Sequence, residues 1–150
     1  MAAYKSILGR RFGLGGNNQL SSNGVDISRP CVDATITVSA EGASVANQRD
    51  ISITLKDSNG VAITYAEMVE LIVFSSSAMT DFTATGGSTG IAAGASGKLL
   101  ALVAKKVFRG ISTTAGVIAC IYTDTGTDAA YLGVRLPNGR IVAGGLLTNA

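Results

Sequence analysis

The chain of 150 residues contains no histidine and no tryptophan. Histidine is the most frequent general base at neutral pH and the commonest metal ligand, so most hydrolytic and many metal-dependent mechanisms lose their central side chain. No serine or cysteine lies in a motif that would supply another base. We therefore expect no enzymatic activity, no cofactor and no metal site, and a function in binding.

Charged residues are also scarce, at 15% of the chain against about 25% in an average soluble protein. Together with 19 glycines, this indicates a surface that is partly covered in an assembly. A small sandwich with a serine- and threonine-rich surface is the alternative. The formal net charge of +2 is too small to indicate nucleic acid by itself, so we expect protein partners and no nucleic acid.

The two cysteines, Cys31 and Cys120, are too few for a disulfide framework. Cys120 lies in the apolar segment 117–122 and is expected to be a small buried hydrophobe. Two free thiols fit synthesis in a reducing cytoplasm, and a bond between them is the alternative.

Long hydrophobic runs are absent as well. The longest apolar stretch runs from Leu99 to Ala104 and ends at Lys105, far short of the roughly 20 residues of a membrane span. Arg10 and Arg11 interrupt the apolar residues near the N-terminus, so we expect no secretory signal and no membrane partner.

Short alternating segments separated by turn residues run from Asp33 to the C-terminus. In 34–40 and 51–56 apolar and polar residues alternate strictly, as in half-buried strands. The β-branched segment 65–75 is predicted to be a central strand buried on both faces. Further strands are expected over 98–104, 106–112, 116–123, 129–136 and 141–147. About eight or nine strands predict an all-β, two-sheet sandwich of the jelly-roll or immunoglobulin-like type over residues 31–150.

The connections between these strands account for most of the acidic residues. Asp57–Gly60 resembles the start of a calcium loop, but Met68 stands where the last ligand should be, so a plain turn is expected. Asp124 and Asp128 flank Gly126 and are expected to form a hairpin turn. Glu67 and Glu70 should face opposite sides of their strand, which argues against paired acid–base catalysis.

The remaining connections are a turn and one long loop. The segment 136–139 reads as the turn of the last hairpin. The segment 75–97 is too long for a simple loop, is expected to be functional or mobile, and contains Phe82 as a possible short-strand anchor. The basic residues Lys98, Lys105, Lys106 and Arg109 are expected on a solvated rim or edge strand, with Lys105 and Lys106 on opposite faces.

Residues 1–30 form a separate glycine-rich arm, in which no stable helix or strand is expected. The arm nevertheless carries apolar and basic side chains that a simple linker would lack. We interpret it as an extended segment that becomes ordered on a neighbouring protein; a flexible tail is the alternative. The candidate binding residues are Tyr4, Ile7, Leu8, Arg10, Arg11, Phe12 and Leu14.

Three segments resemble recurring patterns in virion structural proteins of tailed bacteriophages. In segment 51–60, a strand that ends in Leu-Lys-Asp leads to a glycine turn. Segment 131–145 is similar to the closing hairpin of that group. Segment 97–100 is similar to the part that leads into a lysine-containing strand. The similarity covers about Asp50 to Leu147. Within this group the chain is most similar to capsid cement, or decoration, proteins.

The resemblance implies a non-enzymatic protein on the outer surface of an icosahedral head, where it ties neighbouring subunits of the major capsid protein together. It also implies self-association, with a dimer favoured and a trimer as the alternative. The arm would bind the major capsid protein. A tail-tube or baseplate immunoglobulin-like module and a carbohydrate-binding surface module remain alternative functions.

Overall fold

The computed structural model describes residues 29–43 and 45–149 fully and, in the arm, the backbone of residues 4–5, 11–14, 20–22 and 25–26. The chain divides into two compact units, Met1–Pro30 and Cys31–Ala150. Every regular element in these described residues is a β-strand, and none of them belongs to a helix that could cross a membrane.

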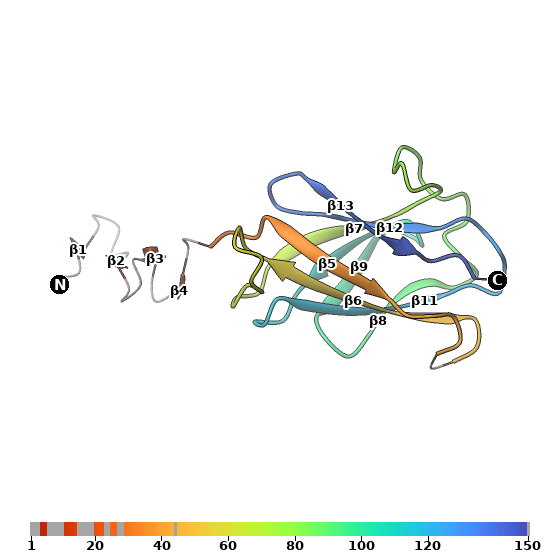
Figure 1. Cartoon of the computed structure of the whole chain (residues 1–150), viewed down its shortest axis with the longest axis horizontal. Coiled ribbons are helices and arrows are strands. Elements are labelled where there is room, and N and C mark those ends of the chain that lie inside the picture. Colours follow the sequence, from red (N-terminus) through yellow and green to blue (C-terminus); the bar gives the residue numbers. More distant parts are fainter. Residues whose placement is uncertain are drawn as a thin grey trace. The chain divides into compact units, whose positions relative to one another are not determined.

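The second unit is a sandwich of two antiparallel sheets, as the alternating pattern predicts (Figure 1). The four-stranded sheet has the order β5-β6-β11-β8 and the five-stranded sheet has the order β13-β12-β7-β10-β9. The bounds of the first sheet are β5 (Asp33–Val38), β6 (Gln48–Lys56), β11 (Val117–Thr123) and β8 (Gly90–Ala93). Those of the second are β13 (Ile141–Leu146), β12 (Tyr131–Arg135), β7 (Met68–Phe74), β10 (Val107–Ile111) and β9 (Lys98–Val103).

The strand order distinguishes between the two predicted sandwich types. An immunoglobulin constant-type domain has strands A, B, E and D in one sheet and C, F and G in the other. Strands β5, β6, β7, β8, β11, β12 and β13 occupy the positions A to G in this order. The topology is therefore immunoglobulin-like, with the β9–β10 hairpin added beside β7.

The core lies between the sheets and follows the two-residue period of the strands. In β6 the side chains of Ile51, Ile53 and Leu55 are buried, while the residues between them are not. β7 and β11 contribute buried residues of the same periodicity, including Leu71 and Tyr122. This alternation is why the sequence predicts these strands well.

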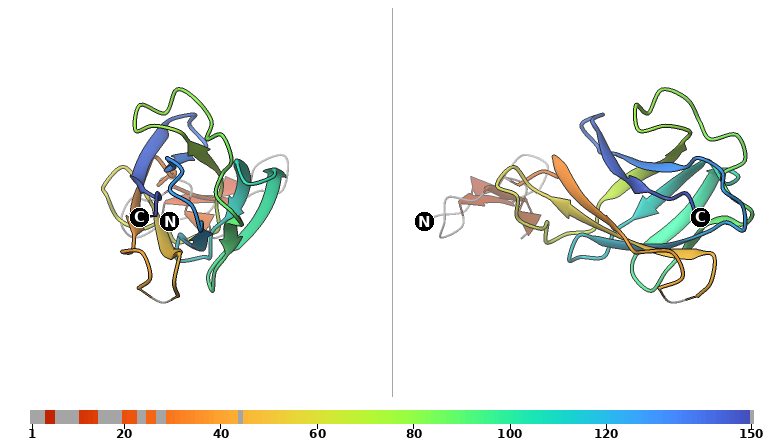
Figure 2. Two further views of the ribbon diagram at one scale, coloured as in Figure 1. Left: turned by 90° about the vertical axis from the view of Figure 1, so that its right-hand side faces the viewer. Right: turned by 45° about the vertical axis from the view of Figure 1, so that its right-hand side comes forward.

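β5 and β13 meet at one side of the sandwich and bring the two sheets together there (Figure 2). A Cβ atom on Gly144 would lie 3.1 Å from Ile36 Cγ2, and one on Gly145 would lie 3.1 Å from Val38 Cγ2. Asp33 lies near Arg140, at the start of β13, so the two strands run in the same direction. Two glycines in succession therefore allow β13 to approach β5 closely.

Several predictions about individual segments need correction. The central position of the 65–75 strand is confirmed, but β7 is not buried on both faces along its whole length. On its outer face Met68 is exposed, Glu70 and Ile72 are half-buried, and Phe74 is buried. β8 was not predicted. Lys105 and Lys106 lie in the turn after β9, where Lys105 has φ 63°, so the prediction that they face opposite sides of a strand is wrong.

The connection 124–130 is not the predicted hairpin turn, because it leads from β11 in one sheet to β12 in the other. The long connection before β8 is held in place by its own contacts. Phe82 forms an isolated bridge with Phe74, and Ser88 donates its N–H to Asp124 Oδ1. The Lys105 ammonium donates to the carbonyl oxygen of Ser88 at 2.7 Å.

In the arm, the described backbone forms four short antiparallel strands in the order β1-β2-β3-β4. Their bounds are Tyr4–Lys5, Arg11–Leu14, Leu20–Ser22 and Val25–Asp26. The sequence predicts no strand here, because glycine and asparagine have low strand propensity. Local antiparallel pairing needs only short connections, and Asn-Gly, at positions 23 and 24, is the dipeptide that two-residue hairpins favour.

Candidate interaction surface

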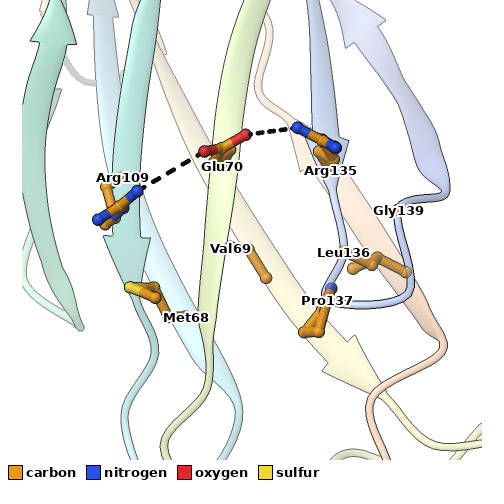
Figure 3. Close-up of a pocket in the computed structure, with 8 residues that line it drawn as sticks. All are labelled: Met68, Val69, Glu70, Arg109, Arg135, Leu136, Pro137 and Gly139. Carbon is orange, nitrogen blue, oxygen red and sulfur yellow. Dashed lines mark hydrogen bonds and ion pairs between the residues drawn. The ribbon is translucent and has the colours of Figure 1, made fainter.

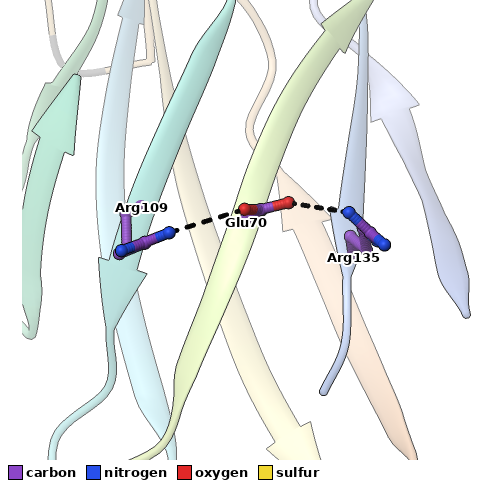
Figure 4. A network of polar contacts seen from close by, with 3 residues as sticks. All are labelled: Glu70, Arg109 and Arg135. Atoms are coloured by element: carbon purple, nitrogen blue, oxygen red, sulfur yellow. Dashed lines mark hydrogen bonds and ion pairs between the residues drawn. The ribbon is translucent and has the colours of Figure 1, made fainter. Parts of the chain in front are cut away.

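A row of three charged side chains crosses the outer face of the five-stranded sheet. Arg109 of β10, Glu70 of β7 and Arg135 of β12 are direct cross-strand partners in the register. Glu70 Oε2 lies 3.2 Å from Arg135 Nη1, and Glu70 Oε1 lies 3.8 Å from Arg109 Nη2 (Figure 4). One carboxylate therefore bridges two guanidinium groups across three neighbouring strands.

Below this row the sheet surface is hollowed (Figure 3). The depression has a volume of about 190 Å³ and extends from the charged row to the turn that connects β12 and β13. It is lined by Met68, Val69, Glu70, Arg109, Arg135, Leu136, Pro137 and Gly139.

The side chains around the charged row are apolar and exposed. Each strand of the five-stranded sheet except β12 contributes at least one large hydrophobic residue that solvent reaches. Soluble monomers rarely expose so many large apolar side chains on one face unless that face binds something. We call this surface the outer apolar face; its exposed hydrophobic residues are Met68, Leu100, Leu102, Ile111, Ile141 and Leu146.

An aromatic pair covers the other end of the same sheet. The rings of Phe74 and Phe82 are stacked, with centroids 6.3 Å apart. Gly133 of β12 makes room for this arrangement, because a Cβ atom there would lie 2.6 Å from Phe74 Cε2. Phe82 remains exposed, so the segment that precedes β8 adds a further apolar side chain beside the sheet.

The charged row is suited to binding rather than to acid–base chemistry. Each arginine gives only part of its five N–H donors to Glu70, and both side chains are about half exposed. The remaining N–H groups can donate hydrogen bonds to a carboxylate of a partner. Glu67, the other glutamate nearby, lies just before β7 and accepts a hydrogen bond from the N–H of Met68.

The aspartates predicted to form turns bind backbone groups. Asp57 Oδ1 accepts hydrogen bonds from the N–H groups of Asn59 and Val61, which confirms the plain turn. Asp124 Oδ1 accepts from Ser88 and Gly126, whereas Asp128 accepts from the Thr85 hydroxyl. Among the described residues, no three histidine, cysteine, aspartate or glutamate side chains are grouped as metal ligands.

Both cysteines are free and buried; the two free thiols and the burial of Cys120 were predicted, and the burial of Cys31 was not. Burial raises the pKa of the Cys120 thiol from 9.0 to about 12. Burial, with the nearby charge of Glu67, raises the pKa of Cys31 to about 11. These thiols are therefore protonated at neutral pH and are poor nucleophiles.

Tyr122, two residues after Cys120 in β11, is also fully buried. Its pKa is raised from 10.0 to about 12, first by burial and then by the charges of Asp124 and Asp128. Within the described part of the chain, its hydroxyl has no hydrogen-bond partner.

A second hollow lies over the four-stranded sheet. It has a volume of about 470 Å³, and its walls are small side chains and backbone of β5, β6 and β11 and of the segment after β8. The segment Gly94–Lys98, which superficially resembles a phosphate loop, borders it. The N–H of Gly94 donates to the carbonyl oxygen of Ala119, and the N–H of Ala119 donates to the carbonyl oxygen of Ser96. The segment therefore continues the pairing along β11 and does not form a phosphate-binding loop.

The predicted basic group is divided among several places. Lys98 lies on the edge strand β9, Lys105 binds the carbonyl groups of Gly87 and Ser88, and Arg109 pairs with Glu70. The predicted edge-strand position is therefore correct for Lys98, whereas Arg109 lies on β10, one strand in from the edge.

The predicted capsid-binding residues lie in the arm. Tyr4 is in β1, and Arg11, Phe12 and Leu14 are in β2, where only the backbone is described; Tyr4 pairs with Phe12. Ile7, Leu8 and Arg10 lie outside the described residues.

The outer apolar face was missed from the sequence. The signal available was the presence of apolar residues at both odd and even positions of 68–74 and 98–104; in the first segment it predicts burial of both faces, and in the second it predicts only a strand. Comparison of the chain with protein-family models, curated proteins and solved structures gives no match.

Proposed function

We propose that this protein is a non-enzymatic structural protein that binds other proteins through its surface. The observation that carries this proposal is the outer apolar face, on which exposed hydrophobic side chains surround a row of two arginines and one glutamate. Apolar area supplies affinity, and the charged row supplies orientation and selectivity.

The more specific role follows from the resemblance of segments 51–60, 97–100 and 131–145 to phage virion proteins. We propose a cement protein on the outer surface of an icosahedral phage head that connects neighbouring major capsid subunits. An immunoglobulin-like sandwich with a separate N-terminal unit supports this role, because the two units offer two places of attachment. Many weak contacts of this kind act together through high effective concentration.

The test uses heads purified without this protein and the full-length chain added back. Deletion of residues 1–25 is expected to leave the sandwich folded and to weaken decoration strongly. Phe12→Ala should weaken binding by about 1–3 kcal/mol per contact, since buried aromatic residues dominate such interfaces. Arg10→Gln and Arg11→Gln should have smaller effects, which decrease further at high salt.

Val45→Ala is the control, because Val45 is an exposed hydrophobic residue in the β5–β6 connection of the sandwich and does not belong to the arm. Normal occupancy of heads by the truncated protein would remove the arm from the mechanism. Binding of the full chain to tails and not to heads would replace the cement function by a tail function.

A further inference from the structure

The five-stranded sheet ends at β9, and no described strand lies beyond it. On such an edge, alternate backbone N–H and C=O groups point away from the sheet and can pair with another strand. Proteins commonly protect their edges with charges, proline, very short strands or a covering element.

The other three edges of the sandwich are protected in these ways. β5 and β13 lie against each other at the side where the sheets meet, and β8 has only four residues. β9 is six residues long, and its own protections lie toward its two ends: Lys98 at the start and a bulge near Leu102. Its side chains are also unusually accessible, with Leu100, Leu102 and Val103 exposed to 63%, 44% and 51%.

We propose that β9 pairs antiparallel with β9 of a second copy of this chain, so that two sandwiches share one continuous sheet. Antiparallel pairing of identical strands obeys two-fold symmetry, in which each residue contacts the equivalent set on its partner. Directly opposite residues in an antiparallel pair share a face, so the outer apolar faces of the two copies become continuous.

The side-chain pattern of β9 is compatible with a second copy as the occupant, because its apolar residues can face each other while its one charge avoids its own equivalent. In the register that places Leu100 opposite Leu100, Lys98 lies opposite Leu102, so no two lysines face each other. Lys105, just beyond the strand, is turned to the carbonyl groups of Gly87 and Ser88. The bulge near Leu102, where the ladder with β10 shifts, falls at the end of the paired stretch.

This inference deepens the proposed function by naming a pair of copies as the binding unit, but its test needs no capsid. Sedimentation equilibrium of the full chain from about 1 μM to about 1 mM should show monomers and dimers, and nothing larger, because pairing uses the edge of each copy. A chain that stays monomeric but still decorates heads would overturn the inference and leave the proposed function standing.

Leu100→Lys should weaken the dimer at least about tenfold, because it places two like charges opposite each other on the paired strands. Ile141→Lys is the matched control: Ile141 is 40% exposed on the same face but lies in β13, at the opposite edge. An unchanged dimer in Leu100→Lys, or loss of the dimer in Ile141→Lys alone, would overturn the inference.

Hydrogen exchange of the unaltered chain provides a second test that does not depend on any variant's folding. Amide protons of alternate β9 residues should become protected as concentration rises, while those of β8 should not change. Protection that is independent of concentration, or trimers in the sedimentation experiment, would show that β9 does not form this pair.

Discussion

At the scale of single residues, Glu70 and Leu71 are neighbours in β7 with opposite environments. Glu70 points outward between two arginines, and its side chain is 30% exposed. Leu71 points inward and is completely buried. Exposed ion pairs contribute little to stability, whereas a buried leucine contributes both transfer free energy and packing.

Glu70→Gln should therefore reduce the free energy of unfolding by no more than about 1 kcal/mol, and Leu71→Ala should reduce it by about 2–5 kcal/mol. Urea unfolding followed by circular dichroism measures both values. A large loss in Glu70→Gln would mean that the charged row holds the three strands together, and that its role is not mainly in binding.

At the scale of the elements, the contact between β5 and β13 depends on two adjacent glycines that are not equivalent. A Cβ atom on Gly144 would lie 2.7 Å from the backbone oxygen of Leu132, which cannot move independently of β12. A Cβ atom on Gly145 meets only the side chain of Val38, at 3.1 Å or more.

We expect Gly144→Ala to destabilise the sandwich by about 1–3 kcal/mol, as overpacking does, and Gly145→Ala to have a smaller effect. The two variants differ by one position and add the same methyl group, so each is the control for the other. Thermal unfolding of both would contradict this interpretation if Gly145→Ala lowered the melting temperature more than Gly144→Ala.

The strands themselves were largely predictable, because alternation in segments such as 34–40 and 51–56 reflects a single buried face. β8 was missed because Gly90–Ala93 contains small residues with little contrast between its two faces. The outer apolar face was missed because hydrophobic residues occur at both odd and even positions of β7 and β9, so the sequence does not show which face is exposed. Whether a face is buried depends on how distant strands pair. Periodicity contains no information about which strands are neighbours.

At the scale of the whole sandwich, three buried groups share one pH dependence. Cys31, Cys120 and Tyr122 all have pKa values above their ordinary range, so the fold favours their protonated forms. Their contribution to stability is complete below pH 9 and is lost as the pH rises toward about 12.

The free energy of unfolding should accordingly fall as the pH rises above 9. In the Cys120→Ala variant it should fall less steeply, because one of the three groups is missing. Between pH 9 and 10.5 the difference between the unfolding free energies of the unaltered protein and the variant should change by about 2 kcal/mol. Each pH unit above the ordinary pKa of the thiol corresponds to about 1.4 kcal/mol. Urea unfolding at several pH values measures this difference. Parallel curves for the two proteins would show that the Cys120 thiol ionises in the folded state as easily as in the unfolded chain.

The path of the chain through the sandwich has a mechanical consequence. β5 starts beside Arg140, whereas Asn149 is fixed near Asp124 and Asn47 at the other end of the strands (Figure 1). A force that pulls residue 31 and residue 149 apart therefore acts along β5 and β13. It loads the hydrogen bonds of β5 with β6 and of β13 with β12 in shear, all at once, instead of opening them one after another. A protein attached at these two points would resist stretching much better than peeling.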